Sequence, residues 1–232
     1  MNNTDDNILA GLFRSIAFDL ARHSSNIADQ CSRALLSSTN STVEKPPATL
    51  AQCKELPRGP AAHDAPLLQT VLASLEHLHW AENADNNGPD VFKAQLAFVE
   101  LLGPTGMVLS SDCRVGLLLI CRDNYYPAHR HAAEELYFVV DGTAQWSSER
   151  SEPTYRPPGS FIHHQSWETH TMVTHDEPLL AVWCWTGDVS FSSYEMVSDE
   201  VADEVSDEVD GEVDGEVDGE VDGEVDNDAG LN

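Results

Sequence analysis

The stretch His129-Arg-His131-Ala-Ala-Glu-Glu135-Leu-Tyr137 has the strongest pattern in this 232-residue sequence. Side chains of an extended strand alternate between two faces, so His129, His131, Glu135 and Tyr137 are predicted to share one face. The hydrophobic residues between and after them would point to the opposite face. His170 follows about forty residues after the first histidine.

Two imidazoles and a carboxylate on one face of a strand form a set of metal ligands. A third imidazole, His170, would come from another strand, and this mixture of nitrogen and oxygen donors suits zinc, iron(II), manganese or nickel. We therefore predict that His129, His131, Glu135 and His170 bind one divalent transition metal ion. A solvent-facing strand would also explain an isolated His-x-His pair, but Glu135, His170 and the intervening glycine turns favour the metal site.

The acidic charge of the chain is concentrated near its end. The formal net charge is −28 at pH 7, yet residues 199–228 contain 16 of the 40 acidic residues and none of the 12 Lys and Arg. The remainder is only moderately acidic, and neither part has the basic stripe that neutralises phosphates. We therefore expect neither nucleic acid nor an anionic membrane surface as a partner.

Cysteine usage and the N-terminus indicate a reducing compartment. The 5 cysteines are dispersed and never spaced as C-x-x-C, which argues against a disulfide framework and a thiolate zinc site. The acidic start, Met1-Asn-Asn-Thr-Asp-Asp6, does not resemble a secretory signal. No apolar run approaches the ~20 residues that cross a bilayer, so we expect a soluble, cytoplasmic protein without a membrane span.

Residues 1–105 are predicted to form an N-terminal helical region. Residues 38–66 within it are rich in Ser, Thr, Pro and Ala, and are expected to be a connecting loop. Apolar residues recur at helical spacing in three segments, namely 7–37 with a break at Ser24-Ser25-Asn26, 67–80, and 91–102.

From about residue 106 the sequence changes to short apolar or alternating runs separated by Gly and Pro, which is typical of an antiparallel sandwich or barrel. Asp141-Gly142 predicts a hairpin, and Arg156-Pro157-Pro158-Gly159 predicts a turn or a sheet edge. The chain is therefore expected to be mainly β, with a small barrel over 106–195. Its predicted strands are 113–121, 126–131, 134–140, 143–147, 160–164, 169–174 and 179–186.

Residues 196–232 form an acidic tail in which Glu-Val-Asp-Gly repeats with a four-residue period from Glu208 onward. Like charges repel, and one valine per repeat is too little apolar surface to offset the ordering entropy. We therefore predict that the tail is disordered. Weak calcium binding is an alternative, but the spacings of known calcium loops are absent.

The region from about 110 to 190 resembles the cupin superfamily, whose first motif is G-x5-H-x-H-x3,4-E-x6-G and whose second is P-x-G followed by a histidine. The first motif is present as His129-x-His131-x3-Glu135-x6-Gly142, and the second as Pro157-Pro158-Gly159 through His170. Asp123 or Asn124 stands where the leading glycine is expected, which affects a turn and leaves the ligands unchanged. The resemblance implies a double-stranded β-helix, also called a jelly-roll barrel.

Three further runs resemble the cupin-type dimethylsulfoniopropionate (DMSP) lyases, and the helical start and barrel length are most similar to the DddL type. The acidic repeat is not something that this family implies. The resemblance covers about a third of the chain, in the runs Tyr125-Tyr126-Pro127-Ala-His129-Arg-His131-Ala-Ala-Glu134-Glu135-Leu-Tyr137, Phe161-Ile162-His163-His164, and Leu179-Leu-Ala-Val-Trp183-Cys-Trp185-Thr-Gly187-Asp188.

This resemblance implies a carbon–sulfur lyase that cleaves DMSP to dimethyl sulfide and acrylate by β-elimination. A base removes a proton from the carbon next to the carboxylate, and the sulfonium leaves from the adjacent carbon. A metal at the predicted ligands could bind the carboxylate and stabilise the enolate-like charge of the transition state as a Lewis acid.

Tyr137 is our candidate for the general base. It follows Glu135 by two residues, and the field of a cation could lower the pKa of its phenol from the ordinary ~10 towards neutrality. Without the flanking ligands, a core tyrosine would be the simpler interpretation. Tyr126 is the second candidate, either as a hydrogen-bond donor to the substrate carboxylate or as an alternative base.

A positive sulfur bearing methyl groups resembles a quaternary ammonium, which aromatic faces attract by ~0.5–2 kcal/mol each. Tryptophans in strands are more often core residues, so we expect only one or two of the candidates to line the site. His163 and His164 could line the same mouth or satisfy the backbone of a turn. The candidate substrate-binding residues are Tyr125, Trp146, Trp167, Trp183, Trp185, His163 and His164.

Two other functions remain open at the level of sequence. An iron-dependent cupin dioxygenase could use the same ligands, although the tyrosine and tryptophan pattern favours elimination. A non-catalytic cupin that only binds a small ligand would need no base. The native metal, the oligomeric state, with a homodimer as one option, and the roles of the helices and of the tail also stay open.

Overall fold

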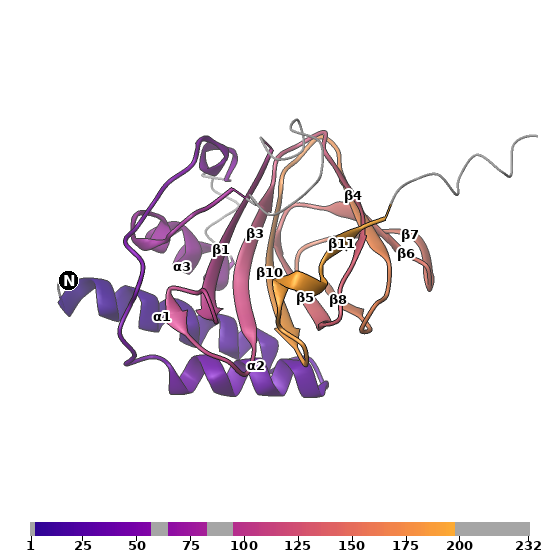
Figure 1. Ribbon diagram of the computed structural model, residues 1–232. Helices are drawn as coiled ribbons and strands as arrows, with labels where there is room; N and C mark the ends of the chain where they lie inside the picture. The colour runs from indigo at the N-terminus through magenta and orange to yellow at the C-terminus, as the bar shows by residue number, and fades with distance from the viewer. Residues whose placement is uncertain (1–2, 57–64, 83–94, 198–232) are drawn as a thin grey trace, which may run out of the picture. The chain divides into compact units, whose positions relative to one another are not determined.

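The computed structural model describes residues 3–56, 65–82 and 95–197. Helices precede a series of strands along the chain, as the indigo-to-yellow colouring in Figure 1 shows. The expectation of a mainly β fold with an N-terminal helical region is confirmed, while the predicted disordered tail lies outside the described residues. The elements are α1 (Asn3–Leu20), α2 (Asn26–Ser37), η1 (Ala51–Glu55), α3 (Pro66–Ser74), η3 (Leu75–His77), β1 (Leu96–Gly103), β2 (Val108–Leu109), β3 (Arg114–Ile120), β4 (Tyr125–Arg130), β5 (Glu134–Asp141), β6 (Ala144–Ser148), β7 (Ser151–Arg156), β8 (Phe161–His164), β9 (His170–Thr174), β10 (Leu179–Thr186), η4 (Phe191–Ser193) and β11 (Glu195–Met196).

The strands form two sheets. One has six strands in the order β2-β1-β3-β10-β5-β8, and the other has five in the order β11-β4-β9-β6-β7. The pairings are antiparallel except for β1 with β2, which is parallel. In Figure 1 the helices lie against the outer side of the six-stranded sheet, and the second sheet lies on its other side.

The six-stranded sheet is buried on both faces. Along β10, Leu180, Val182 and Cys184 belong to the cluster that includes the helices, which we call the helix-side core. Ala181, Trp183 and Trp185 belong to a second cluster between the sheets, which we call the barrel core. Because strand side chains alternate faces, one strand contributes to both cores.

The helical layer follows the predicted pattern. The chain breaks between α1 and α2, where the Ser25 hydroxyl accepts a hydrogen bond from the amide of Ala28 and caps α2. Such a cap satisfies one of the amides that a helix leaves unpaired at its start. Leu12, Ile16 and Leu20 of α1 are fully buried in the helix-side core.

The helix predicted over residues 91–102 is wrong, because the described part of this segment is strand β1. Its odd-numbered residues Ala97, Val99 and Leu101 face the helix-side core, and Leu96 enters the barrel core. A strand buried on both faces has a continuous apolar run, which periodicity alone does not distinguish from a buried helix. The sheet therefore begins at Leu96, before residue 106 where we expected the barrel to start.

All seven strands predicted from residue 113 onward are present as β3, β4, β5, β6, β8, β9 and β10. The argument that one extended stretch aligns residues 129–137 is wrong, because β4 and β5 belong to different sheets. The chain changes sheet between Arg130 and Glu134. The amide of Trp167 donates to the carbonyl of His131 at this corner, at 2.8 Å. The corner, and not strand parity, brings the histidines to Glu135.

The turn at Asp141-Gly142 also joins the two sheets, so it does not form the expected hairpin between β5 and β6. Gly142 has a φ of +76°, and a Cβ there would lie against the carbonyl oxygen of Pro178. Only glycine fits such a position without strain. The proline-rich stretch after Arg156 forms a turn, as predicted, and it follows the edge strand β7, which was not predicted.

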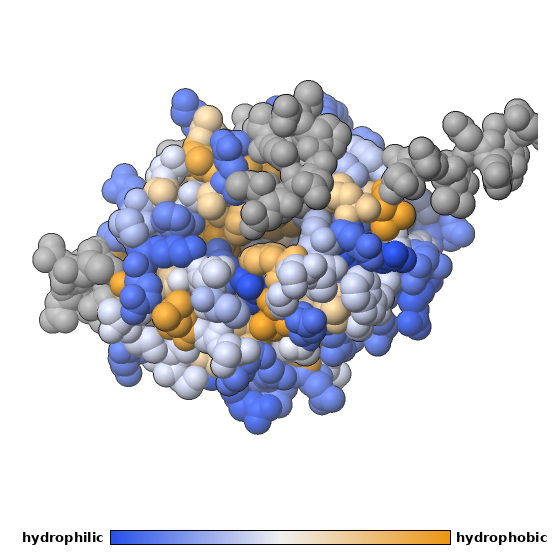
Figure 2. Space-filling model, viewed as in Figure 1, coloured by the Kyte–Doolittle hydropathy of each residue, from blue (hydrophilic) through white to orange (hydrophobic). Residues whose placement is uncertain are grey.

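The surface seen in Figure 2 is mostly hydrophilic, and its apolar residues form separate small patches. Large apolar side chains gather in the two cores instead. Among the described residues, none of the helices combines the length and the apolar character needed to cross a bilayer.

Candidate active site

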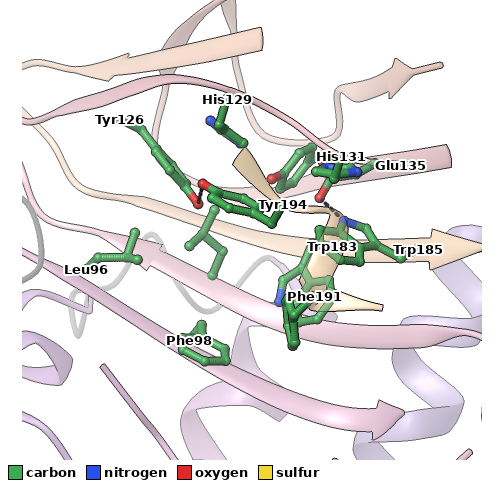
Figure 3. A pocket seen from close by; sticks show the side chains of 12 residues that line it. Leu96, Phe98, Tyr126, His129, His131, Glu135, Trp183, Trp185, Phe191 and Tyr194 are labelled. Carbon is green, nitrogen blue, oxygen red and sulfur yellow. Dashed lines mark hydrogen bonds and ion pairs between the residues drawn. The ribbon is translucent and has the colours of Figure 1, made fainter. Parts of the chain in front are cut away.

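A cavity of about 80 Å³ opens in the barrel core, next to the predicted metal ligands. Its polar side consists of histidines, Glu135 and tyrosines, and its other side consists of hydrophobic and aromatic residues from β1, β3, β10 and the segment after β10 (Figure 3). The lining residues are Leu96, Phe98, Leu118, Tyr126, His129, His131, Glu135, Tyr137, Trp183, Trp185, Phe191 and Tyr194.

Three of the four predicted ligands form a compact group. One ligand atom of each of His131, Glu135 and His170 lies within 4.8 Å of the others, and all three residues are buried. The Nε2 atoms of His131 and His170 lie 2.9 Å and 3.2 Å from Oε2 of Glu135. His131 comes from the corner between the sheets, Glu135 from β5 and His170 from β9.

The other nitrogen of each histidine ring is held by the backbone. Nδ1 of His131 lies 3.1 Å from the carbonyl oxygen of Ala133, and Nδ1 of His170 lies 2.9 Å from that of Glu168. A carbonyl only accepts hydrogen bonds, so each Nδ1 donates to it. Each Nε2 therefore points towards Glu135, which is the arrangement in which a histidine can bind a metal ion through Nε2.

Glu135 is oriented by a residue on the neighbouring strand. The indole Nε1 of Trp185 donates to Oε1 of Glu135 at 2.7 Å, which leaves Oε2 towards the two histidines. Burial acts to raise the pKa of Glu135, but the imidazoles of His131 and His170 outweigh it and hold that pKa well below its usual range. The carboxylate is therefore ionised.

His129 is close to this group but is not part of it. Its ring centroid lies 4.1 Å from that of His170 and 6.4 Å from that of His131. Its Nδ1 lies 2.8 Å from the carbonyl oxygen of Pro127. Burial, followed by the neighbouring His170, holds the pKa of His129 well below its usual range, so the ring is neutral.

The donor set fits a metal ion. Nε2 of His170 is buried, and its contact with Oε2 of Glu135 at 3.2 Å does not have hydrogen-bond geometry. Such a buried polar atom is costly unless something else satisfies it. Two imidazoles and one carboxylate match the ligands of divalent transition metals, and each is oriented by a hydrogen bond at its other polar atom. These residues support the prediction of a metal cofactor, but they do not identify the metal.

Both tyrosines predicted to be catalytic lie in the cavity wall. Burial, and then the carboxylate of Glu135, raise the pKa of Tyr137 well above its usual range in the protein alone. The Tyr126 hydroxyl lies 3.1 Å from that of Tyr194, and its ring stacks on His129 with centroids 4.3 Å apart.

Tyr194 and Phe191 were not predicted from the sequence. They lie in residues 187–196, which we call the C-terminal strap, between the last long strand and the acidic tail. Its sequence, Gly-Asp-Val-Ser-Phe-Ser-Ser-Tyr-Glu-Met, has no periodicity that would place a side chain. Two aromatic residues in an otherwise polar loop are the only signal that could have indicated them.

Two of the five candidate aromatic residues, Trp183 and Trp185, line the cavity. Trp146 is buried behind it, with its ring centroid 4.8 Å from that of Tyr137. Tyr125 and Trp167 are 43% and 47% exposed and are not brought to the cavity.

His163 and His164 do not line this cavity either. Nε2 of His163 lies 2.7 Å from Oε1 of Glu134, on the side of β5 that faces away from the ligands. His164 is buried and stacks on His170 with centroids 4.0 Å apart. Burial and the adjacent His170 lower the pKa of His164 to about 3. His164 therefore supports a ligand ring from behind.

Comparison with known proteins yields one family. A family model described as dimethylsulfoniopropionate lyase matches residues 19–181. The DMSP lyase DddQ of Ruegeria pomeroyi is 33% identical over 98 residues, which cover 42% of this chain and 49% of that protein. A putative DMSP lyase DddL of Cereibacter sphaeroides is 32% identical over 101 residues, covering 43% and 42% respectively. The match spans about half the length of these relatives. Because the two identities are nearly equal, they do not show whether the chain is of the DddQ or the DddL type.

Solved structures share the fold. A chain from the crystal structures of the DMSP lyases RdDddP and RnDddQII matches 82% of this chain and 98% of its own length, with a TM-score of 0.65 and 22% identity. The crystal structure of DddQ from Ruegeria pomeroyi matches 79% of this chain and 96% of its own, with a TM-score of 0.58 and 22% identity. At these identities the matches show a shared fold.

Proposed function

Because the chain belongs to the DMSP lyase family, we propose that it cleaves DMSP to dimethyl sulfide and acrylate. The observation that supports this most directly is the two-sided cavity, which has His131 and Glu135 of the metal-type group and tyrosine hydroxyls on one side and aromatic rings on the other. DMSP is a zwitterion with a carboxylate at one end and a sulfonium at the other. The two ends of the substrate therefore correspond to the two sides of the cavity.

His131, Glu135 and His170 would hold the metal, and His129 is a fourth candidate ligand because it packs beside them. When bound, the metal supplies a Lewis acid that stabilises negative charge developing on the substrate and lowers the pKa of nearby acids. Zinc, iron(II), manganese and nickel all suit these donors.

We retain the cytoplasm as the proposed location.

The tyrosines would handle the substrate carboxylate and the proton. Tyr126 can donate its hydroxyl hydrogen to the carboxylate, because its partner Tyr194 can act as donor or acceptor. Tyr137, beside Glu135, is the proposed base and would act as a phenolate, because the positive field of a bound metal ion would offset the burial and the Glu135 charge that raise its pKa in the protein alone. It takes the proton from the carbon next to the carboxylate, the released electron pair forms the double bond of acrylate, and the C–S bond breaks towards sulfur. Dimethyl sulfide leaves uncharged, so charge and atoms balance.

The aromatic side of the cavity would bind the sulfonium. Trp183 and Trp185 lie with their ring centroids 5.8 Å apart, and both line the cavity. Aromatic faces attract methylated cations most strongly where water is excluded. As the positive charge disappears when the C–S bond breaks, the neutral product loses this attraction and can depart.

Incubation of metal-loaded protein with DMSP, with dimethyl sulfide measured in the headspace and acrylate in solution, tests the proposal. The two products should appear in equal amounts with and without oxygen. Turnover that stops without oxygen would identify a dioxygenase instead. Binding of DMSP without either product would identify a non-catalytic cupin.

A further inference from the structure

The C-terminal strap crosses the cavity and is attached at both ends. At its far end β11 pairs with β4, and the amide of Val197 donates to the carbonyl of Ala128 at 2.8 Å. In its middle the Ser193 hydroxyl accepts from the amide of Ala132 at 3.2 Å. Figure 3 shows Phe191 and Tyr194 of this strap directed towards the cavity. Part of the cavity wall therefore comes from chain beyond residue 181, where the match to the family model ends.

Arg114 fixes the near end of the strap. Its Nε donates to the carbonyl of Val189 at 2.6 Å, and its guanidinium carbon lies 3.9 Å from the ring centroid of Phe191. The side chain of Arg114 is 4% exposed, and its charge is paired with Glu100 at 2.7 Å. One buried guanidinium thus holds both the backbone before Phe191 and the ring of Phe191.

The ion pair is itself held rigidly. The hydroxyl of Thr105 donates to Oε2 of Glu100 at 2.6 Å, and its amide donates to Oε1 at 3.1 Å. Arg114 also donates to the Thr105 hydroxyl at 3.1 Å. A planar guanidinium can make these bonds and stack on a ring at once, whereas the ammonium of lysine cannot. The position of Phe191 is therefore determined by a network outside the cavity.

From this arrangement we infer that Phe191 determines which alkyl groups on the sulfonium the enzyme accepts, and that Arg114 is the positioning residue that holds it. The inference rests on the proposed function. A carboxylate cannot lie at the apolar side of the cavity without a partner, so the sulfonium substituents face that side. Phe191 closes this side next to Trp185, with ring centroids 5.2 Å apart. In a cavity of about 80 Å³ a fixed ring leaves little room for longer alkyl groups.

The test compares DMSP with diethylsulfoniopropionate, which carries one extra methylene on each alkyl group. In the native enzyme, kcat/KM for DMSP should exceed that for the diethyl compound by more than ~10-fold, because one methylene that does not fit lowers kcat/KM by about 10-fold or more. Phe191→Ala should lower this ratio by about 10-fold or more. Arg114→Lys should lower it in the same direction while retaining the charge. Phe161→Ala, an equally partly buried phenylalanine outside the cavity, should leave the ratio unchanged.

A binding measurement keeps this inference separate from the proposed function. Quenching of tryptophan fluorescence by each sulfonium compound reports binding next to Trp183 and Trp185 even if no turnover occurs. The same shift in the ratio of the two Kd values on Phe191→Ala supports the inference. If Phe191→Ala does not fold, Phe191→Leu takes its place. An unchanged ratio in a folded variant overturns the inference, whereas absence of dimethyl sulfide from the native enzyme overturns only the proposed function.

Discussion

Trp185→Phe should weaken metal binding without removing a metal ligand. The substitution keeps an aromatic ring in the cavity wall but deletes the indole N–H that donates to Oε1 of Glu135 at 2.7 Å. Both residues are buried, at 3% and 2% exposure, so water cannot replace the lost donor. A hydrogen bond to a charged group contributes ~1.5–3 kcal/mol. Because about 1.4 kcal/mol changes a dissociation constant tenfold, the dissociation constant of the metal ion should rise roughly 10- to 150-fold.

Competition between the protein and a fluorescent chelator for zinc measures this change directly. Trp183→Phe is the matched control, because Trp183 lies on the same side of β10, also lines the cavity, and has no hydrogen bond to Glu135. Its affinity for zinc should stay within about twofold of the native value. If Trp185→Phe also binds zinc with native affinity, the carboxylate is not oriented by the indole, and the account of how Glu135 is prepared for a metal is wrong.

Four further outcomes are expected. Tyr137→Phe should keep its metal content but lose about 10²–10⁴-fold in kcat, the usual contribution of a general base; native turnover in this variant would remove Tyr137 from that role. Chelation should abolish dimethyl sulfide release and added metal should restore it, whereas His131→Ala should contain little metal by elemental analysis and should not be restored. The Cys113 thiol, whose pKa is raised by its hydrogen bond with Cys31 and then by burial, should react with a thiol reagent only after unfolding, as mass spectrometry of labelled peptides would reveal. Removal of residues 199–232 should leave kcat and Tm nearly unchanged, because a like-charged repeat has little apolar surface to bury, and a fall of many degrees would contradict this.

Strands that are short and bounded by turn residues could be predicted from the sequence, and β1 could not. β9 alternates in burial, and β10 is a buried run bounded by Pro178 and Gly187, so the limits of both agree with the predicted ones within one residue. β1 is apolar on both faces because the sheet separates two cores. Nothing within residues 91–102 indicates that a helical layer lies on one side and a barrel on the other, and that information alone distinguishes a strand from a helix there.

The metal group could be predicted because its residues belong to short motifs, whereas the rest of the cavity could not. His131 and Glu135 are four residues apart, so any compact arrangement of the chain keeps them close. Phe191 and Tyr194 reach the cavity through contacts with Arg114 and Tyr126, which lie about seventy residues earlier. Such contacts depend on the tertiary fold. For the same reason the exposed Tyr125 and Trp167 could not be separated in advance from Trp183.

The six-stranded sheet is at once the inner wall of the cavity and the platform on which the helices pack. Val182 and Cys184 touch the helix-side core, while Trp183 and Trp185 alternate with them on the cavity side. Close-packed interiors transmit small displacements, so a volume change beneath α2 would move the two indoles without altering any residue in contact with substrate. Activity in this protein should accordingly be tunable from a distance, and selection for a new substrate would be expected to recover substitutions at helix–sheet positions as well as in the cavity.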